Sequence, residues 1–199
     1  MSEPHHPVVP PPPSRWRPDR DLVVSIAAIV LSVSALGVSL VQTAVMRAQQ
    51  YAAVWPRLTT VVDIYPTSFR VSVRNAGVGP AQIVWAQGLL DGVPLHGWAA
   101  LVARAAAVAP DTAHAPPRTS IASLSDDVLI AGERKVLLGV DGPIARGMTT
   151  LTPHVGLRIC YCSVFDRCWQ LENLGLADPS ASDRIVPVSR CDRPTTPLI

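Results

Sequence analysis

The chain has 199 residues and a formal net charge of +2 at pH 7, with 20 prolines and Lys135 as its only lysine. This length accommodates one domain of ordinary size with appendages. Because the charge is small and no segment concentrates Lys and Arg, the composition argues against a nucleic-acid-binding protein. The abundance of Ala, Pro and Arg is typical of a protein encoded in a GC-rich bacterial genome.

Residues 1–21 form a Pro-rich N-terminal tail that includes four consecutive prolines, Pro10 to Pro13. Such a segment buries too little apolar surface to build a core, so an extended or disordered spacer is expected. Alternatively, the proline run could dock in an aromatic groove of another protein. His5 and His6 are adjacent but have no further ligands nearby, so they make a poor metal site.

Residues 22–55 are predicted to form a transmembrane helix followed by a short helical stalk. The run from Leu22 to Met46 contains 25 residues without a charge. As a helix it spans about 37 Å, enough to cross a hydrocarbon core about 30 Å thick with some tilt. A cleaved signal peptide is the alternative, but its apolar region covers only about 7–15 residues and ends in a small-residue cleavage site. The helical pattern continues to Trp55, and Pro56 is expected to end it.

The charges that flank the apolar run indicate its orientation. More arginines precede the run than follow it: Arg15, Arg17 and Arg20 against Arg47 and Arg57. The side richer in Lys and Arg usually stays in the cytoplasm. We therefore expect a single-pass protein of the bacterial inner membrane, with a cytoplasmic N-terminus and a periplasmic C-terminal domain. Tyr51 is close enough to the run to lie at the membrane interface.

One face of the predicted span carries small residues at a spacing of three and four. Its members are Ser25, Ala28, Ser32, Ala35, Ser39 and Gln42. In lipid, helices associate through close backbone approach and interhelical hydrogen bonds, and small residues and an amide permit both. The stripe therefore predicts helix packing with a second copy of the chain or with another membrane protein. The alternative is that each serine bonds its own helix backbone and that the spacing has no packing role.

Residues 57–175 are predicted to form a β-rich extracytoplasmic domain. From Leu58 the hydrophobic period changes to two, and short strands alternate with turn signals. At least seven such strands, with hairpins at 127–140 and 154–174, favour a mainly antiparallel β-sandwich.

Three segments depart from this strand pattern. Residues 98–108 place apolar side chains on one helical face and are expected to form a short helical insertion. Residues 110–120 are expected to form a Pro-containing loop. Residues 176–199 are rich in Pro, Ser and Asp and are expected to form an irregular C-terminal tail.

The cysteines are Cys160, Cys162, Cys168 and Cys191. Their spacing matches neither the paired knuckles of most zinc sites nor a redox C-x-x-C motif, so two structural disulfides are expected, with zinc as the alternative. In a strand over residues 155–162, Cys160 and Cys162 share the face opposite the core face. The five-residue loop Ser163–Arg167 sets Cys162 opposite Cys168, which leaves Cys160 to pair with Cys191.

The sequence contains no motif of a nucleophilic or metal-dependent enzyme: G-x-S-x-G, S-x-x-K and H-E-x-x-H are all absent. His96, His114 and His154 are separated in loops or at the ends of predicted elements. Asp126 and Asp127 precede a strand and fit a solvated turn. We therefore assign no catalytic, metal-binding or cofactor-binding residue, and we expect no cofactor.

The segment VRNAGVGPAQI, residues 73–83, contains a G-x-G after a predicted strand. A dinucleotide site needs a third glycine and a following helix. This segment has neither, so it fits a turn in which Asn75 and Gly77 supply permissive backbone and Pro80 fixes the next step. Together with the uncharged span and the segment CYCSVFDRCW, it resembles a group of small bacterial single-pass proteins of unknown activity. Their membrane-proximal β domain carries an N-x-G-x-G-P-A turn. The resemblance covers about residues 22–90 and implies this architecture, but it lends no catalytic residues.

Three functions are compatible with these features. The first is a non-enzymatic envelope protein that anchors a β-rich interaction domain, with the lipid bilayer as a partner and no nucleic acid. The second is a membrane-tethered periplasmic hydrolase, whose pocket would gather His154 or His96 with a carboxylate and a hydroxyl. The third is a module whose helix at 97–107 touches lipid, an idea motivated only by its single charge, Arg104.

Overall fold

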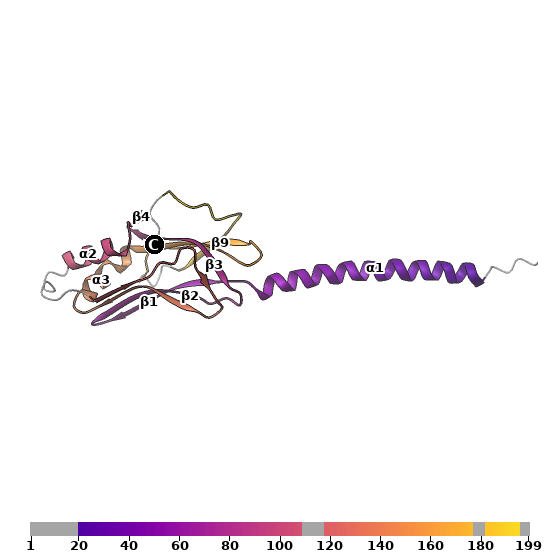
Figure 1. Ribbon diagram of the computed structural model, residues 1–199, viewed down its shortest axis with the longest axis horizontal. Helices are drawn as coiled ribbons and strands as arrows, with labels where there is room; N and C mark the ends of the chain where they lie inside the picture. The colour runs from indigo at the N-terminus through magenta and orange to yellow at the C-terminus, as the bar shows by residue number, and fades with distance from the viewer. Residues whose placement is uncertain (1–19, 109–117, 177–181, 196–199) are drawn as a thin grey trace, which may run out of the picture. The chain divides into compact units, whose positions relative to one another are not determined.

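The computed structural model describes residues 20–108, 118–176 and 182–195 (Figure 1). It divides into two units that meet between Ala48 and Gln49, and each is considered by itself. The first unit contains most of helix α1, and the second contains the strands and the shorter helices. The predicted spacer at residues 1–19 and His114 lie outside the described residues.

Helix α1 runs from Arg20 to Ala53 and is long and apolar enough to cross a membrane. Asp21 lies in its first turn, where a negative charge interacts favourably with the helix dipole. All side chains from Leu22 to Met46 are exposed, so the described chain leaves the apolar surface of this segment uncovered. The helix ends three residues before Pro56, in agreement with the prediction that this proline cannot continue it.

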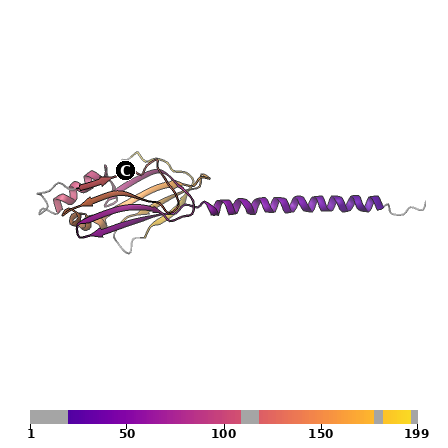
Figure 2. The same cartoon turned by 60° about the horizontal axis from the view of Figure 1, so that its bottom comes forward.

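The second unit contains two antiparallel sheets. The first has the strand order β1-β2-β7-β5 and consists of β1 (Leu58–Tyr65), β2 (Ser68–Asn75), β7 (Arg134–Asp141) and β5 (Arg118–Ile121). The second has the order β10-β9-β8-β3-β4, with β6 also paired to β3. Its strands are β10 (Arg184–Val188), β9 (Cys168–Asn173), β8 (Val155–Cys162), β3 (Ala81–Leu90), β4 (Val93–Pro94) and β6 (Val128–Leu129). Figure 2 shows β1 and β2 running side by side along the first sheet.

One hydrophobic cluster takes side chains from both sheets. Phe69 and Val71 of β2 are buried in the same cluster as Leu157, Ile159 and Tyr161 of β8. These three residues of β8 alternate along the strand and face the core, as the period of two predicts. Burial of such side chains is the main favourable term in the folding of the domain.

Two short helices lie together at one end of the domain (Figure 1). Helix α2, Trp98–Val108, is the helical insertion predicted from the sequence, and it buries Trp98, Leu101 and Ala105 in the cluster. Helix α3, Ala145–Leu151, was not predicted. It buries Met148 and continues into a 3₁₀ turn at Thr152–His154.

The structure corrects three expectations about the strands. The tail at 176–199 is not wholly irregular, because β10 pairs with β9. Its Pro187 argues against a strand in the sequence, but proline is tolerated in an edge strand such as β10. The segment expected as a loop at 110–120 contains the start of the fully exposed edge strand β5. The hairpin expected at 127–140 does not form, because the chain crosses from one sheet to the other between β6 and β7.

The segment before β10 joins the two sheets. The Asp183 carboxylate accepts hydrogen bonds from the backbone N–H of Thr60 at 2.8 Å and from its hydroxyl at 2.5 Å. The same carboxylate accepts a bond from Asn173 Nδ2 at 2.9 Å. Thr60 belongs to β1 and Asn173 to β9, so one side chain ties the two sheets together.

Tyr161 makes the stability of the domain sensitive to alkaline pH. Burial raises the pKa of its phenol from 10.0 to about 12. Because the pKa is raised in the folded state, the contribution of Tyr161 to the free energy of unfolding is complete below pH 10 and is lost as the pH rises through about 12. We expect this loss to be on the order of 2–3 kcal/mol. Tyr161→Phe should flatten the profile of unfolding free energy between these pH values, and urea titrations of both proteins will measure it. A parallel decline in both proteins contradicts the assignment.

Candidate functional site

The turn at residues 75–79 binds the segment at residues 54–57, which links α1 to β1, and we call this contact the junction clamp. Asn75 is fully buried at its centre. Its Nδ2 donates to the carbonyls of Gly79 at 2.8 Å and Leu129 at 3.0 Å. Its Oδ1 accepts from the backbone N–H groups of Arg57 at 3.2 Å and Gly77 at 3.0 Å. This amide therefore uses both its donors and both acceptor positions.

The backbones of the two segments are also bonded directly. The N–H of Val78 donates to the carbonyl of Trp55 at 3.0 Å, and the N–H of Ala76 donates to the carbonyl of Arg57 at 2.7 Å. A Cβ at Gly79 would lie 2.1 Å from the carbonyl oxygen of Val54, closer than two such atoms can approach. The glycines of the N-x-G-x-G turn thus serve close packing of two backbones, a role that the sequence pattern did not reveal.

A second contact involves the five-residue loop at Ser163–Arg167, which we call the hairpin tip. The ring of Phe165 packs edge-on against the ring of Tyr51, with 5.0 Å between the ring centroids. The Arg167 guanidinium lies over the Tyr51 ring, 5.2 Å from its centroid. An arginine in this position interacts favourably with the ring. The last turn of α1 and the hairpin tip are therefore held together within the second unit.

The four cysteines form two adjacent disulfides, Cys160–Cys191 and Cys162–Cys168. This is the pairing that the strand register predicts, and Cys162 does lie opposite Cys168. The sulfur atoms of Cys162 and Cys191 are 3.8 Å apart although they belong to different disulfides. A zinc site needs thiolates, and among the described residues no cysteine is free. The close sulfur atoms are therefore a structural feature of two neighbouring cross-links.

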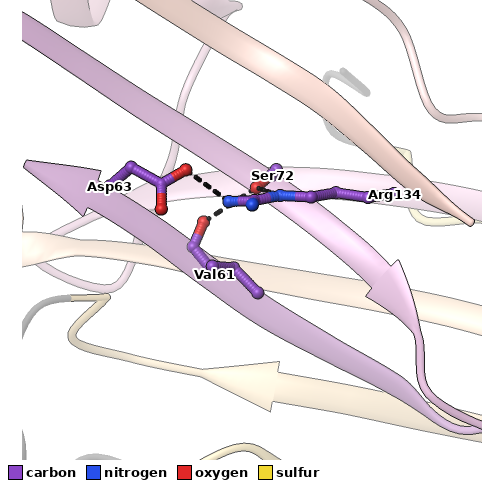
Figure 3. Close-up of polar contacts among 4 residues, drawn as sticks. All are labelled: Val61, Asp63, Ser72 and Arg134. Atoms are coloured by element: carbon purple, nitrogen blue, oxygen red, sulfur yellow. Dashed lines mark hydrogen bonds and ion pairs between the residues drawn. The ribbon is translucent and has the colours of Figure 1, made fainter. Parts of the chain in front are cut away.

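A polar network crosses the outer face of the first sheet (Figure 3). Arg134 of β7 pairs with Asp63 of β1, and its Nε donates to Ser72 Oγ of β2 at 2.7 Å. Ser72 in turn donates to the carbonyl of Val61 at 3.2 Å. The Arg134 guanidinium is bonded to residues of its own sheet, and the network links three neighbouring strands. We therefore interpret it as a structural feature and not as a ligand-binding site.

Two further clusters resemble parts of a binding or catalytic site. His154 Nδ1 lies 2.7 Å from Asp91 Oδ1, but both side chains are more than half exposed. In the described part of the chain, neither His154 nor His96 is hydrogen-bonded to a hydroxyl, so neither histidine forms a hydroxyl–imidazole pair there. The second cluster lines an open groove and consists of Ile64, Tyr65, Pro66, Arg146, Thr149 and Thr150.

The stripe of small residues on α1 lies on an exposed helix, and two of its three hydroxyls bond within that helix. Ser25 Oγ donates to the Asp21 carbonyl and Ser32 Oγ donates to the Ala28 carbonyl, both at 2.7 Å. These bonds satisfy two serines without a neighbouring helix. Any packing through the stripe therefore rests on close approach of small side chains, on the Ser39 hydroxyl and on Gln42, and helix packing stays a prediction.

Comparison of the chain with protein-family models, with curated proteins and with solved structures finds no match. The assignment of function therefore rests on the residues themselves. The sequence pattern identified the turn at 75–79 and the cysteines. It did not single out Val164 and Phe165, although an apolar pair inside a five-residue loop between two cysteines was a visible signal.

Proposed function

We propose that this chain is a single-pass protein of the bacterial inner membrane that holds a disulfide-bonded β domain on the periplasmic side. The observation that carries the proposal is the exposure of every side chain from Leu22 to Met46 on a long, apolar helix. In water, so large a continuous apolar surface is unfavourable, whereas a hydrocarbon core accommodates it. The two disulfides support an oxidising compartment for the domain.

We further propose that the domain acts through contacts with other molecules and does not catalyse a reaction. The exposed His154–Asp91 pair supports a solvated turn better than the buried, oriented dyad of a hydrolase. The two sheets contribute to one hydrophobic cluster, which supports a sandwich-like arrangement that presents loops and outer faces. Association of α1 with a second copy or another membrane protein through the small-residue stripe is part of this proposal.

The single lysine of the chain allows a direct test of orientation. Lys135 is 29% exposed and pairs with Asp127 on the domain. A membrane-impermeant amine reagent applied to intact spheroplasts is expected to modify Lys135, because the domain lies outside the cytoplasm. Mass spectrometry of the peptide that contains residue 135 will measure the extent of modification.

Lys135→Arg is the matched control, since it keeps the positive charge beside Asp127 and removes the reactive amine. Modification at residue 135 only after the spheroplasts are lysed places the domain in the cytoplasm and contradicts the proposed orientation. Recovery of the chain in the soluble fraction contradicts the membrane anchor itself.

A further inference from the structure

The hairpin tip exposes two neighbouring apolar side chains. Val164 is 44% exposed and Phe165 is 42% exposed. The tip is closed by the disulfide Cys162–Cys168, and the N–H of Ser163 donates to the Arg167 carbonyl at 2.7 Å. A further bond runs from the N–H of Asp166 to the Ser163 carbonyl at 3.1 Å. The fold thus holds the two apolar side chains outward on a short, cross-linked loop.

The residue that the tip contacts, Tyr51, lies close in sequence to the end of the apolar run. Tyr51 follows Met46 by five residues, and its ring touches that of Phe165. Five residues extend about 7.5 Å in a helix and at most about 18 Å in a fully extended chain. The headgroup layer on each side of a bilayer is about 5–8 Å thick. If the run ends at the hydrocarbon boundary, the helical distance is about the thickness of the headgroup layer, so Tyr51 and the tip that it contacts can lie at the lipid surface.

We propose that the hairpin tip is a lipid-contacting element, with Val164 and Phe165 at the boundary between the phospholipid headgroups and the acyl chains. This inference rests on the proposed membrane anchor. Tyr51 belongs to the residue types that favour this boundary. Arg167 supplies a guanidinium that can bind lipid phosphate groups. The exposed carboxylate of Asp166 is unfavourable in hydrocarbon, so it limits the tip to the headgroup layer.

The phenylalanine content of the chain permits a clean test. Phe69 and Phe165 are its only two phenylalanines, and Phe69 is buried in the core. The full chain, labelled with 4-fluorophenylalanine and placed in phospholipid nanodiscs, should give two fluorine resonances, which Phe165→Leu assigns. A nitroxide carried on the upper acyl chain of the lipid is expected to broaden the Phe165 resonance beyond detection and to leave the Phe69 resonance intact. A water-soluble gadolinium chelate should broaden the Phe165 resonance much less.

The possible outcomes separate this inference from the anchor on which it rests. Broadening of the Phe165 resonance by the gadolinium chelate and not by the lipid nitroxide shows that the tip faces water, and it overturns the inference while the anchor stands. Insensitivity of the Phe165 resonance to both agents means that protein covers the tip, for example a second copy, and also overturns it. A chain that does not enter nanodiscs overturns the anchor and the lipid contact together.

Discussion

Replacing Asn75 with alanine is expected to lower the free energy of unfolding of the β domain by about 2–6 kcal/mol. The substitution removes the donors for two buried carbonyls, those of Gly79 and Leu129, and each unsatisfied buried group costs about 1–3 kcal/mol. It also removes the acceptor for the N–H groups of Arg57 and Gly77. Denaturant unfolding of the full chain in detergent, followed by tryptophan fluorescence, will measure the change.

Two variants of the same turn sharpen this test. Val78 is 66% exposed, so Val78→Ala should change the free energy of unfolding by less than about 0.5 kcal/mol. Gly79→Ala should destabilise the domain by a steric route, because its Cβ would lie 2.1 Å from the Val54 carbonyl oxygen. If Asn75→Ala unfolds at the same denaturant concentration as Val78→Ala, the clamp does not contribute to stability.

Removal of the disulfide Cys160–Cys191 is expected to destabilise the domain more than removal of Cys162–Cys168. The first bond joins residues 31 positions apart and the second joins residues 6 positions apart. In the chain-entropy description, cross-links of these lengths contribute about 3.7 and about 2.2 kcal/mol. The two double variants, Cys160→Ala with Cys191→Ala and Cys162→Ala with Cys168→Ala, can be compared by denaturant unfolding under oxidising conditions.

The pairwise comparison also tests how the segment around β10 is held. Loss of Cys160–Cys191 should increase proteolysis near Asp183, because the disulfide and the edge pairing of β10 together fix this segment. The variant without Cys162–Cys168 keeps that cross-link and serves as the matched control. Equal destabilisation in the two double variants, or the opposite order, contradicts the loop-length argument.

The cysteine pairing was accessible to sequence reasoning because two local rules determine it. Alternation along a strand puts Cys160 and Cys162 on one face, and the length of the loop sets Cys162 opposite Cys168. The long helix and the helical insertion at α2 were also accessible from local sequence. The first was predicted from its long uncharged apolar run, and the second from its apolar helical face.

Features that depend on distant partners were not accessible in the same way. The pattern around Asn75 indicates a turn, but nothing local shows that its amide also bonds Leu129, which lies 54 positions away. Strand β10 was missed because its five residues include Pro187 and because it exists only as an addition to the edge of β9. The segment that contains β6 and β7 resembled a hairpin because apolar and polar residues alternate in both strands. Which sheet each strand joins depends on the packing of the whole core and not on this local alternation.

The bonds from Thr60 to Asp183 have a consequence for how the domain is made. These two residues are 123 positions apart, and Cys191 must also find Cys160 before the second edge is secured. During synthesis or export β1 becomes available long before residues 183–191, so its Thr60 N–H bonds water in the meantime. The final cross-sheet contacts therefore form only after nearly all the described strands have left the ribosome or translocation pore. An arrested chain that lacks residues 183–191 leaves the Thr60 N–H and the edge of β9 without these partners, which makes it distinguishable to proteases from a finished molecule.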